Sequence, residues 1–208
     1  MTPAPQADTH FHVFRAGVAL PGARYTPGYD ATLETWQTTA AALGVTHGVL
    51  VQTSFMGTDN SLLLAQLAAQ PETLRGVAVV SPDANLAVLA PLHTQGVRGI
   101  RLNLAGRSHE MGGWTAATAL WDAVMQLGWH VELHTDTGAL PGVLAALPQA
   151  LHLVVDHFAK PARAAAHDAT VVALRRRSLL DGVATVHVKL NAAYRMGLEV
   201  KPRAITRL

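Results

Sequence analysis

Cysteine is absent from this 208-residue chain, and charged and aromatic side chains are scarce. Without cysteine there is no disulfide bond and no thiolate zinc site, so a bound metal would need histidine and carboxylate ligands. No apolar run approaches the roughly 20 residues of a membrane span, and no basic segment followed by an apolar core marks a signal peptide. We therefore expect a cytoplasmic protein with no membrane partner.

An extended basic surface is also missing. The formal net charge is +2, and no Lys/Arg patch with interleaved aromatics is found. We therefore expect no nucleic-acid partner. The one basic run, at 175–177, is typical of a solvated helix face.

Apolar residues, by contrast, make up 50% of the chain, and short apolar segments alternate with helical patterns. This alternation predicts a parallel sheet within one domain, residues 1–208. Strands are expected at 8–12, 48–52, 74–80, 97–103, 129–134, 151–157 and 186–190. Helices are expected at 33–43, 60–69, 86–95, 114–127, 140–147 and 162–180.

Two architectures compete for this pattern, a doubly wound open sheet and a (β/α)8 barrel. The open sheet usually carries a glycine-rich turn after its first strand, and this sequence has His10-Phe11-His12 there instead. Polar side chains gather at the predicted strand ends, where barrel enzymes keep their active sites. We therefore expect an α/β fold of the (β/α)8 TIM-barrel type that lacks the eighth strand.

Histidines supply the first candidate site. In a strand, His10 and His12 point to one face while Phe11 points to an apolar layer. Two such imidazoles can chelate a divalent metal or polarise a carbonyl. His134 ends the fifth predicted strand, and the pair Asp156-His157 ends the sixth, where burial of both side chains would require partners.

Arginines supply the second candidate site. Arg101 lies in an otherwise apolar strand, Arg107 in the following loop, and Arg195 after the seventh strand. At one rim they would form a clamp for carboxylates, which arginine binds bidentately. The alternative is that each pairs with a structural acid such as Glu132 or Asp156.

Five segments, taken in order, resemble the amidohydrolase-2 group of the amidohydrolase superfamily, which includes lactonases. The resemblance covers essentially the whole chain. The segments are Asp8-Thr9-His10-Phe11-His12, Gln52-Thr53-Ser54 with Gly57-Thr58-Asp59-Asn60, Gly96-Val97-Arg98-Gly99-Ile100-Arg101-Leu102-Asn103, Asp156-His157-Phe158-Ala159-Lys160-Pro161 and Val188-Lys189-Leu190-Asn191-Ala192-Ala193-Tyr194-Arg195.

The resemblance implies a hydrolase that opens the lactone ring of a small acidic substrate such as 2-pyrone-4,6-dicarboxylate. Catalytic groups that polarise the carbonyl would be His10, His12 and His157. Substrate-binding groups would be Tyr25, Ser54, Arg101, Arg107, His134 and Arg195. Either no cofactor is needed, or one divalent metal, zinc for instance, is held by His10, His12, His134 and His157.

One family feature is missing: the strand-eight motif whose aspartate acts as the general base. We therefore expect a C-terminally truncated barrel with open strand edges, which are suited to pairing in a homo-oligomer. Two alternatives stand beside the lactonase. One is a zinc-dependent amidohydrolase or decarboxylase, and the other is an inactive barrel that acts as a binding or vestigial protein.

Overall fold

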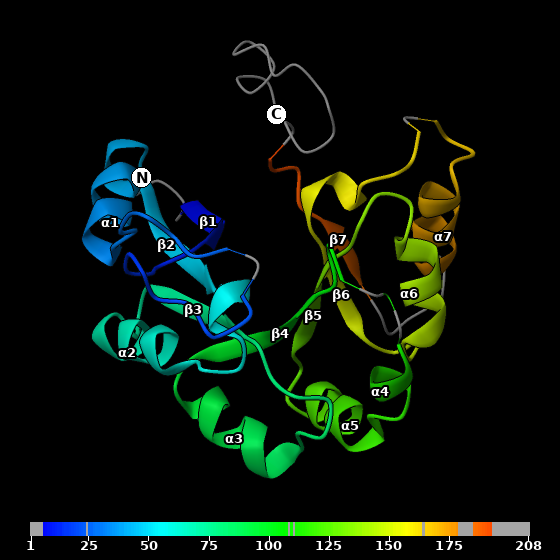
Figure 1. The fold of residues 1–208 in the computed structure, drawn as a ribbon, viewed down its shortest axis with the longest axis horizontal. Coiled ribbons are helices and arrows are strands. Elements are labelled where there is room, and N and C mark those ends of the chain that lie inside the picture. Colours follow the sequence, from blue (N-terminus) through cyan, green and yellow to red (C-terminus); the bar gives the residue numbers. More distant parts are fainter. Residues whose placement is uncertain are drawn as a thin grey trace, which may run out of the picture. The chain divides into compact units, whose positions relative to one another are not determined.

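The computed structural model describes residues 6–23, 25–107, 109, 111–163, 165–178 and 185–192. Over these residues strands and helices alternate along the chain (Figure 1). They form two compact units, one from the described residues of Met1–Arg101 and Ala117–Trp129, the other from those of Leu102–Ala116 and His130–Leu208. In the described part of the chain, none of the helices combines the length and apolarity that a bilayer crossing demands.

The first unit is built on parallel strands that pair in chain order. The strands are β1 (Gln6–Phe11), β2 (Val45–Val51), β3 (Leu74–Ala78) and β4 (Val97–Asn103), the last two residues of which belong to the second unit. The helices are α1 (Leu33–Ala42), η1 (Ser54–Met56), α2 (Ser61–Ala69), α3 (Leu86–Thr94) and α5 (Thr118–Gln126). Leu50, Val77 and Ile100 are fully buried, as expected of covered parallel strands.

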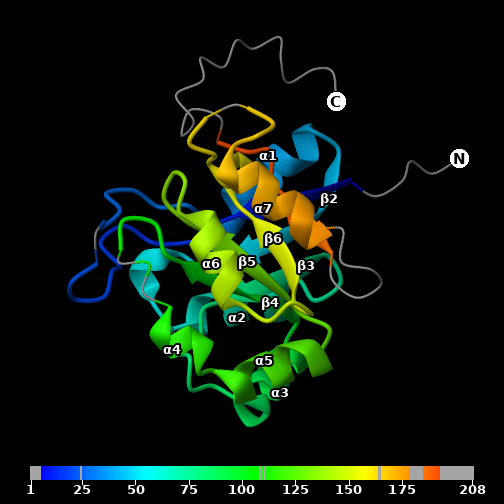
Figure 2. The same ribbon diagram turned by 90° about the vertical axis from the view of Figure 1, so that its right-hand side faces the viewer.

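The second unit has three parallel strands, again paired in chain order. They are β5 (His130–His134), β6 (His152–Val155) and β7 (Val186–Val188). Its helices are α4 (Gly112–Thr115), α6 (Leu140–Ala146), η2 (His157–Ala159) and α7 (Ala169–Ser178). α6 and α7 lie side by side beside these strands (Figure 2).

All seven predicted strands are present, but several predicted boundaries are wrong, among them the three that follow. The helix expected at 114–127 is interrupted, because the backbone at Ala117 has ψ 47° and leaves the helical region between α4 and α5. The strand expected at 151–157 ends at Val155, and His157 opens a turn instead. The helix expected from 162 begins at Ala169, after a capping aspartate.

That aspartate is Asp168. Its carboxylate accepts hydrogen bonds from the backbone N–H groups of Thr170 (2.8 Å) and Arg163 (2.9 Å). Desolvation alone would raise the pKa of Asp168, but these donated hydrogen bonds outweigh it and hold the pKa below its usual value. The stabilisation is therefore present above the unfolded-state pKa and is lost as the pH falls through the folded-state pKa.

We expect Asp168→Ala to lower the melting temperature at neutral pH, because the first turn of α7 loses its cap. The difference from the parent chain should shrink as the pH falls below the usual aspartate pKa of about 3.9 and then through the lowered pKa of folded Asp168. Thermal melts followed by circular dichroism check this, with the exposed Asp122→Ala on α5 as control. An equal deficit at every pH would contradict the capping role.

Gly48 on β2 lies beneath two stacked rings. Phe11 and Trp36 have ring centroids 4.1 Å apart and an interplanar angle of 11°. The Trp36 indole is fixed by its hydrogen bond to Asp8 (2.9 Å). A Cβ atom at Gly48 would lie 2.6 Å from Trp36 Cζ2 and 2.7 Å from Phe11 Cε1, so any side chain must displace the stack.

Gly48→Ala is therefore expected to lower the free energy of unfolding by about 1–3 kcal/mol, the usual cost of overpacking a core. Urea denaturation measures it. Gly142→Ala on α6 is the matched control, since its Cβ would meet nothing within 4 Å. That change should leave stability equal or raise it by about 0.5–1 kcal/mol. Equal effects of the two substitutions would refute the packing argument.

Candidate active site

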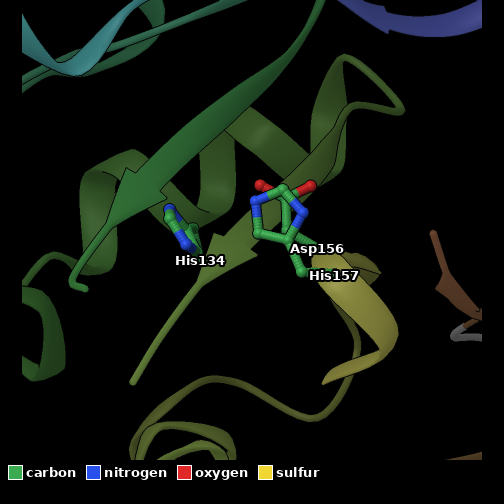
Figure 3. Close-up of side chains that lie close together, drawn as sticks. All are labelled: His134, Asp156 and His157. Atoms are coloured by element: carbon green, nitrogen blue, oxygen red, sulfur yellow. The ribbon is translucent and has the colours of Figure 1, made fainter. Parts of the chain in front are cut away.

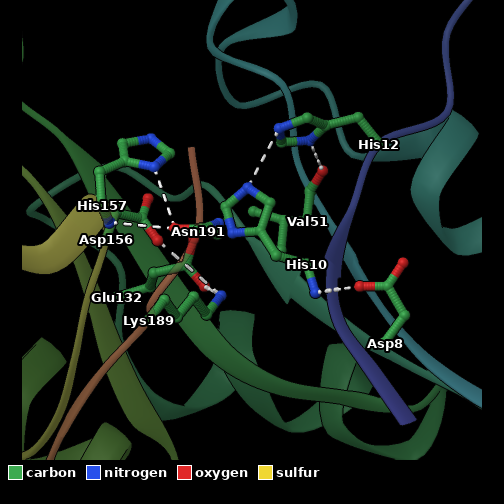
Figure 4. A network of polar contacts seen from close by, with 9 residues as sticks. All are labelled: Asp8, His10, His12, Val51, Glu132, Asp156, His157, Lys189 and Asn191. Atoms are coloured by element: carbon green, nitrogen blue, oxygen red, sulfur yellow. Dashed lines mark hydrogen bonds and ion pairs between the residues drawn. The ribbon is translucent and has the colours of Figure 1, made fainter. Parts of the chain in front are cut away.

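His10 and His12 form a hydrogen-bonded pair in the first unit (Figure 4). Their Nε2 atoms lie 3.2 Å apart, and His12 Nδ1 lies 2.7 Å from the carbonyl oxygen of Val51 at the end of β2. A carbonyl can only accept, so neutral His12 carries its proton on Nδ1 and accepts from His10 at Nε2. Phe11 is buried on the other side, as predicted. A single hydrogen bond therefore joins the two half-buried rings.

In the second unit the ends of β5 and β6 bring together three buried groups, His134, Asp156 and His157 (Figure 3). One ligand atom from each lies within 4.8 Å of the others. The two imidazoles meet edge to face, with centroids 4.7 Å apart and an interplanar angle of 84°. Imidazole nitrogens and carboxylate oxygens are ligand types that a divalent metal such as zinc binds in proteins.

Asn191, just after β7, fixes the orientation of His157 (Figure 4). Its Oδ1 lies 3.1 Å from the backbone nitrogen of His157 and 3.1 Å from Nδ1 of the ring. Since the backbone N–H can only donate, this atom is the amide oxygen, and Nδ1 must also donate to it. A neutral His157 therefore has its lone pair on Nε2.

A left-handed turn follows β6. Four consecutive non-glycine residues have positive φ, namely His157 (55°), Phe158 (57°), Ala159 (61°) and Lys160 (41°). Such backbone costs each L-residue about 1 kcal/mol or more, and it persists where the surroundings over-determine it. Here the N–H of Phe158 donates to the carbonyl of Lys189 (2.9 Å), which ties the turn to the residue after β7.

Lys160 ends this turn and is buried. Its ammonium lies 3.1 Å from His134 Nε2 and 3.0 Å from the carbonyl oxygen of Thr135. Lys189 is a second buried cation. It forms an ion pair with Glu132 and lies 3.9 Å from Asp156 Oδ1. Charged groups thus accompany the histidines at the ends of β5 and β6.

Arg107 lies in a loop that Asp136 anchors. Both carboxylate oxygens of Asp136 accept from the N–H of Gly106, at 3.0 and 2.8 Å. His109 Nε2 accepts from the backbone N–H of Asp136 (3.3 Å). The loops after β4 and β5 are therefore joined directly beside Arg107, which itself is exposed.

The other predicted site residues lie on separate elements of the chain. Arg101 is buried near the end of β4, and Ser54 begins η1 half-buried. Tyr25 is 50% exposed, with its ring centroid 6.0 Å from that of Phe55. Desolvation, followed by the neighbouring Tyr29, raises the pKa of Tyr25. Arg195 lies outside the described residues.

Sequence reasoning missed Lys160 and Lys189. Both stand in the segments that carry the family resemblance, three residues after His157 and two before Asn191. A lysine inside a motif of otherwise apolar and site residues is itself a signal, because burying an ammonium requires partners.

Comparisons with known proteins agree with these motifs. The family described as Amidohydrolase matches residues 7–206. A 2-pyrone-4,6-dicarboxylate hydrolase of Comamonas testosteroni is 33% identical over 165 residues, 76% of this chain and 53% of that protein. A 4-sulfomuconolactone hydrolase of Rhizobium radiobacter is 29% identical over 166 residues, 76% of this chain and 54% of that protein. The chain thus spans about half the length of the curated relatives it matches.

A solved structure gives the same result for the fold. It is named as a 2-pyrone-4,6-dicarboxylic acid hydrolase of Acinetobacter baumannii, with citric acid bound, and is 31% identical. The TM-score is 0.80, and the match covers 93% of this chain and 72% of that chain. This confirms the predicted TIM-barrel-like α/β fold, with seven strands and no eighth among the residues described. Since the family match spans nearly the whole sequence, this protein belongs to the amidohydrolase family.

Proposed function

We propose that this chain is a hydrolase that opens the lactone ring of a small carboxylate-bearing substrate, with 2-pyrone-4,6-dicarboxylate as the first compound to test. Two relatives named as hydrolases of a pyrone dicarboxylate and of a muconolactone support the lactone class. The observation that carries the proposal is His157. Its ring is buried at the end of β6 and oriented by Asn191.

The tautomer of His157 suits it to acid–base work. Because Nδ1 donates to Asn191, a neutral ring offers the lone pair of Nε2 as a base. In the proposed step, Nε2 takes a proton from water while the water oxygen bonds to the lactone carbonyl carbon. The ring C–O bond then breaks, and the departing oxygen takes the proton back from Nε2. The products are an enol or alcohol and a carboxylic acid on one open chain, and the acid then releases its proton to solvent as it becomes a carboxylate.

Arg107 is proposed to bind a substrate carboxylate. It is exposed beside Gly106, whose anchoring to Asp136 restricts the loop, and a guanidinium matches a carboxylate with two parallel hydrogen bonds. The remaining assignments stay predictions. They are carbonyl polarisation by His10 and His12, substrate contact by His134, Tyr25 and Ser54, and carboxylate binding by Arg101 and Arg195.

Hydrolysis of 2-pyrone-4,6-dicarboxylate by the purified chain, with a chelator present, tests the proposal. Ring opening is followed by the loss of pyrone absorbance. Arg107→Gln should lower kcat/KM by about 10- to 150-fold, the worth of a charged hydrogen bond of roughly 1.5–3 kcal/mol. Arg107→Lys should retain part of the activity, and the exposed Arg175→Gln on α7 should change nothing. A folded chain that hydrolyses neither this compound nor other lactones would refute the function and favour a binding role.

A metal-dependent hydrolase is the second candidate, favoured by the convergence of His134, Asp156 and His157. A bound divalent ion would lower the pKa of a coordinated water to about 7. Asp156 and the Nε2 atom of His157 suit such an ion, since neither needs to give up a proton. His134 does not, because Lys160 Nζ lies 3.1 Å from its Nε2. Metal analysis of the purified chain, and activity with and without zinc, test this candidate.

A further inference from the structure

We propose that Lys160 sets the tautomer of His134 and keeps that ring from binding a metal ion, so that a lysine ammonium provides the positive charge at the end of β5. The use of this arrangement in catalysis rests on the proposed lactone hydrolysis. The arrangement itself rests on the geometry of the second unit alone.

The hydrogen bond between Lys160 and His134 has only one direction. An ammonium carries three donors and no acceptor, so Nζ of Lys160 donates to His134 Nε2 at 3.1 Å and to the carbonyl of Thr135 at 3.0 Å. A ring that accepts at Nε2 and is neutral has its proton on Nδ1. His134 is therefore held as the Nδ1–H tautomer.

This tautomer is closed to metals at both nitrogens. A histidine ligand binds an ion through the lone pair of a deprotonated nitrogen. The lone pair at Nε2 of His134 already accepts from Lys160, and Nδ1 bears the proton. Metal-bound histidines usually donate their second N–H to a carboxylate or carbonyl, which raises their basicity. A hydrogen bond from an ammonium to the ring instead lowers the basicity of the ring.

The backbone is arranged to deliver this lysine. The left-handed turn from His157 carries the chain from the end of β6 back toward β5, where the carbonyl of Lys160 accepts from the N–H of Gly138 (2.9 Å). The N–H of Lys160 donates to the carbonyl of His157 (3.2 Å). Its side chain is 8% exposed. A strained turn and a buried cation each cost folding free energy. Their presence here is explained if the contact between Lys160 and His134 serves the site.

For the proposed reaction, Lys160 would act as a positioning residue through His134. An ammonium on Nε2 draws electron density from the ring and makes Nδ1–H a stronger donor. The same contact leaves Asp156 and His157 as the only two members of the buried trio of the second unit that can still ligate an ion.

Two measurements that need no turnover test this inference. The first is the ¹⁵N spectrum of the histidine rings, assigned by comparison with His134→Gln, which should show the Nδ1–H tautomer for His134. The second is zinc titration by calorimetry. Lys160→Met should bind zinc at least about tenfold more tightly than the parent chain, because changes around a ligand alter metal affinity about 10- to 100-fold. Lys160→Arg should bind no more tightly.

The double variant Lys160→Met with His134→Gln separates the ring from the general loss of positive charge. If His134 becomes a ligand, the gain in zinc affinity must vanish in the double variant. Unchanged zinc affinity in Lys160→Met, or a gain that persists without His134, would overturn the inference. If Lys160→Met fails to fold, the parent spectrum decides, because an Nε2–H tautomer at His134 is incompatible with the proposal. None of these outcomes depends on lactone hydrolysis.

Discussion

Lys189→Met is expected to lower the free energy of unfolding by about 3–5 kcal/mol, the cost of removing one partner from a buried ion pair. The Glu132 side chain on β5 is fully buried and pairs with Lys189. Asp156 is also buried, with Oδ1 3.9 Å from the same ammonium. Methionine has a similar length but no charge, so both carboxylates would lose the Lys189 ammonium in the folded state only.

Urea denaturation at neutral pH measures this loss. The double variant Lys189→Met with Glu132→Gln should recover part of the stability, because the buried acid is then uncharged. Arg175→Gln, which removes an exposed charge from α7, should stay within about 0.5 kcal/mol of the parent chain. A loss below about 1 kcal/mol for Lys189→Met would show that solvent compensates the two acids, and the ion pair would then not hold β7 to β5.

The sequence predicted the strands because a buried parallel strand has a local signature. Runs such as 48–52 and 97–103 are apolar and β-branched. The first became β2 with shifted ends, and the second became β4 with the predicted ends. The predicted strand ends also placed His134 and Asp156 at the same edge of the sheet, because neighbouring parallel strands such as β5 and β6 end at one edge. Periodicity was therefore enough to predict that these two side chains lie at neighbouring strand ends.

Partners of charged side chains were not predictable in this way. The run 175–177 was expected to be a solvated helix face, and for Arg177 this is wrong. Arg177 is 3% exposed, and its guanidinium donates to the carbonyls of Leu144 and Leu147, both at 3.3 Å, at the end of α6. Desolvation lowers the pKa of Arg177. Three adjacent arginines point in three directions on a helix, and sequence alone does not say which faces the neighbour.

The left-handed turn was equally hidden. None of the four residues His157-Phe158-Ala159-Lys160 is a glycine or an asparagine, the residues that usually mark a positive φ. Tertiary hydrogen bonds impose the conformation, notably those that Asn191 Oδ1 and the carbonyl of Lys189 accept from the turn, and both acceptors follow in the chain by about 30 residues. The contact of Lys160 with His134 depends on that turn, so the chemistry of the histidine could be predicted but not its tautomer.

His157→Gln should have the largest effect on activity. If Nε2 of His157 moves the proton in the proposed hydrolysis, kcat should fall by about 10²- to 10⁴-fold, the usual contribution of a positioned acid–base group. KM should change little, because glutamine keeps a polar side chain of similar reach in the same turn. Steady-state kinetics with 2-pyrone-4,6-dicarboxylate measure both.

Two comparisons distinguish chemistry from structure in that experiment. His152→Gln, at the start of β6, replaces a histidine whose Nδ1 hydrogen-bonds to Thr185, and it should leave kcat unchanged. Asn191→Leu keeps the His157 ring but removes the acceptor at Nδ1, so it should lower kcat and alter its pH profile. If His157→Gln retains more than about a tenth of the parent kcat, His157 does not carry the proton. The hydrogen-bonded pair of His10 and His12 would then be the first alternative candidate for the base.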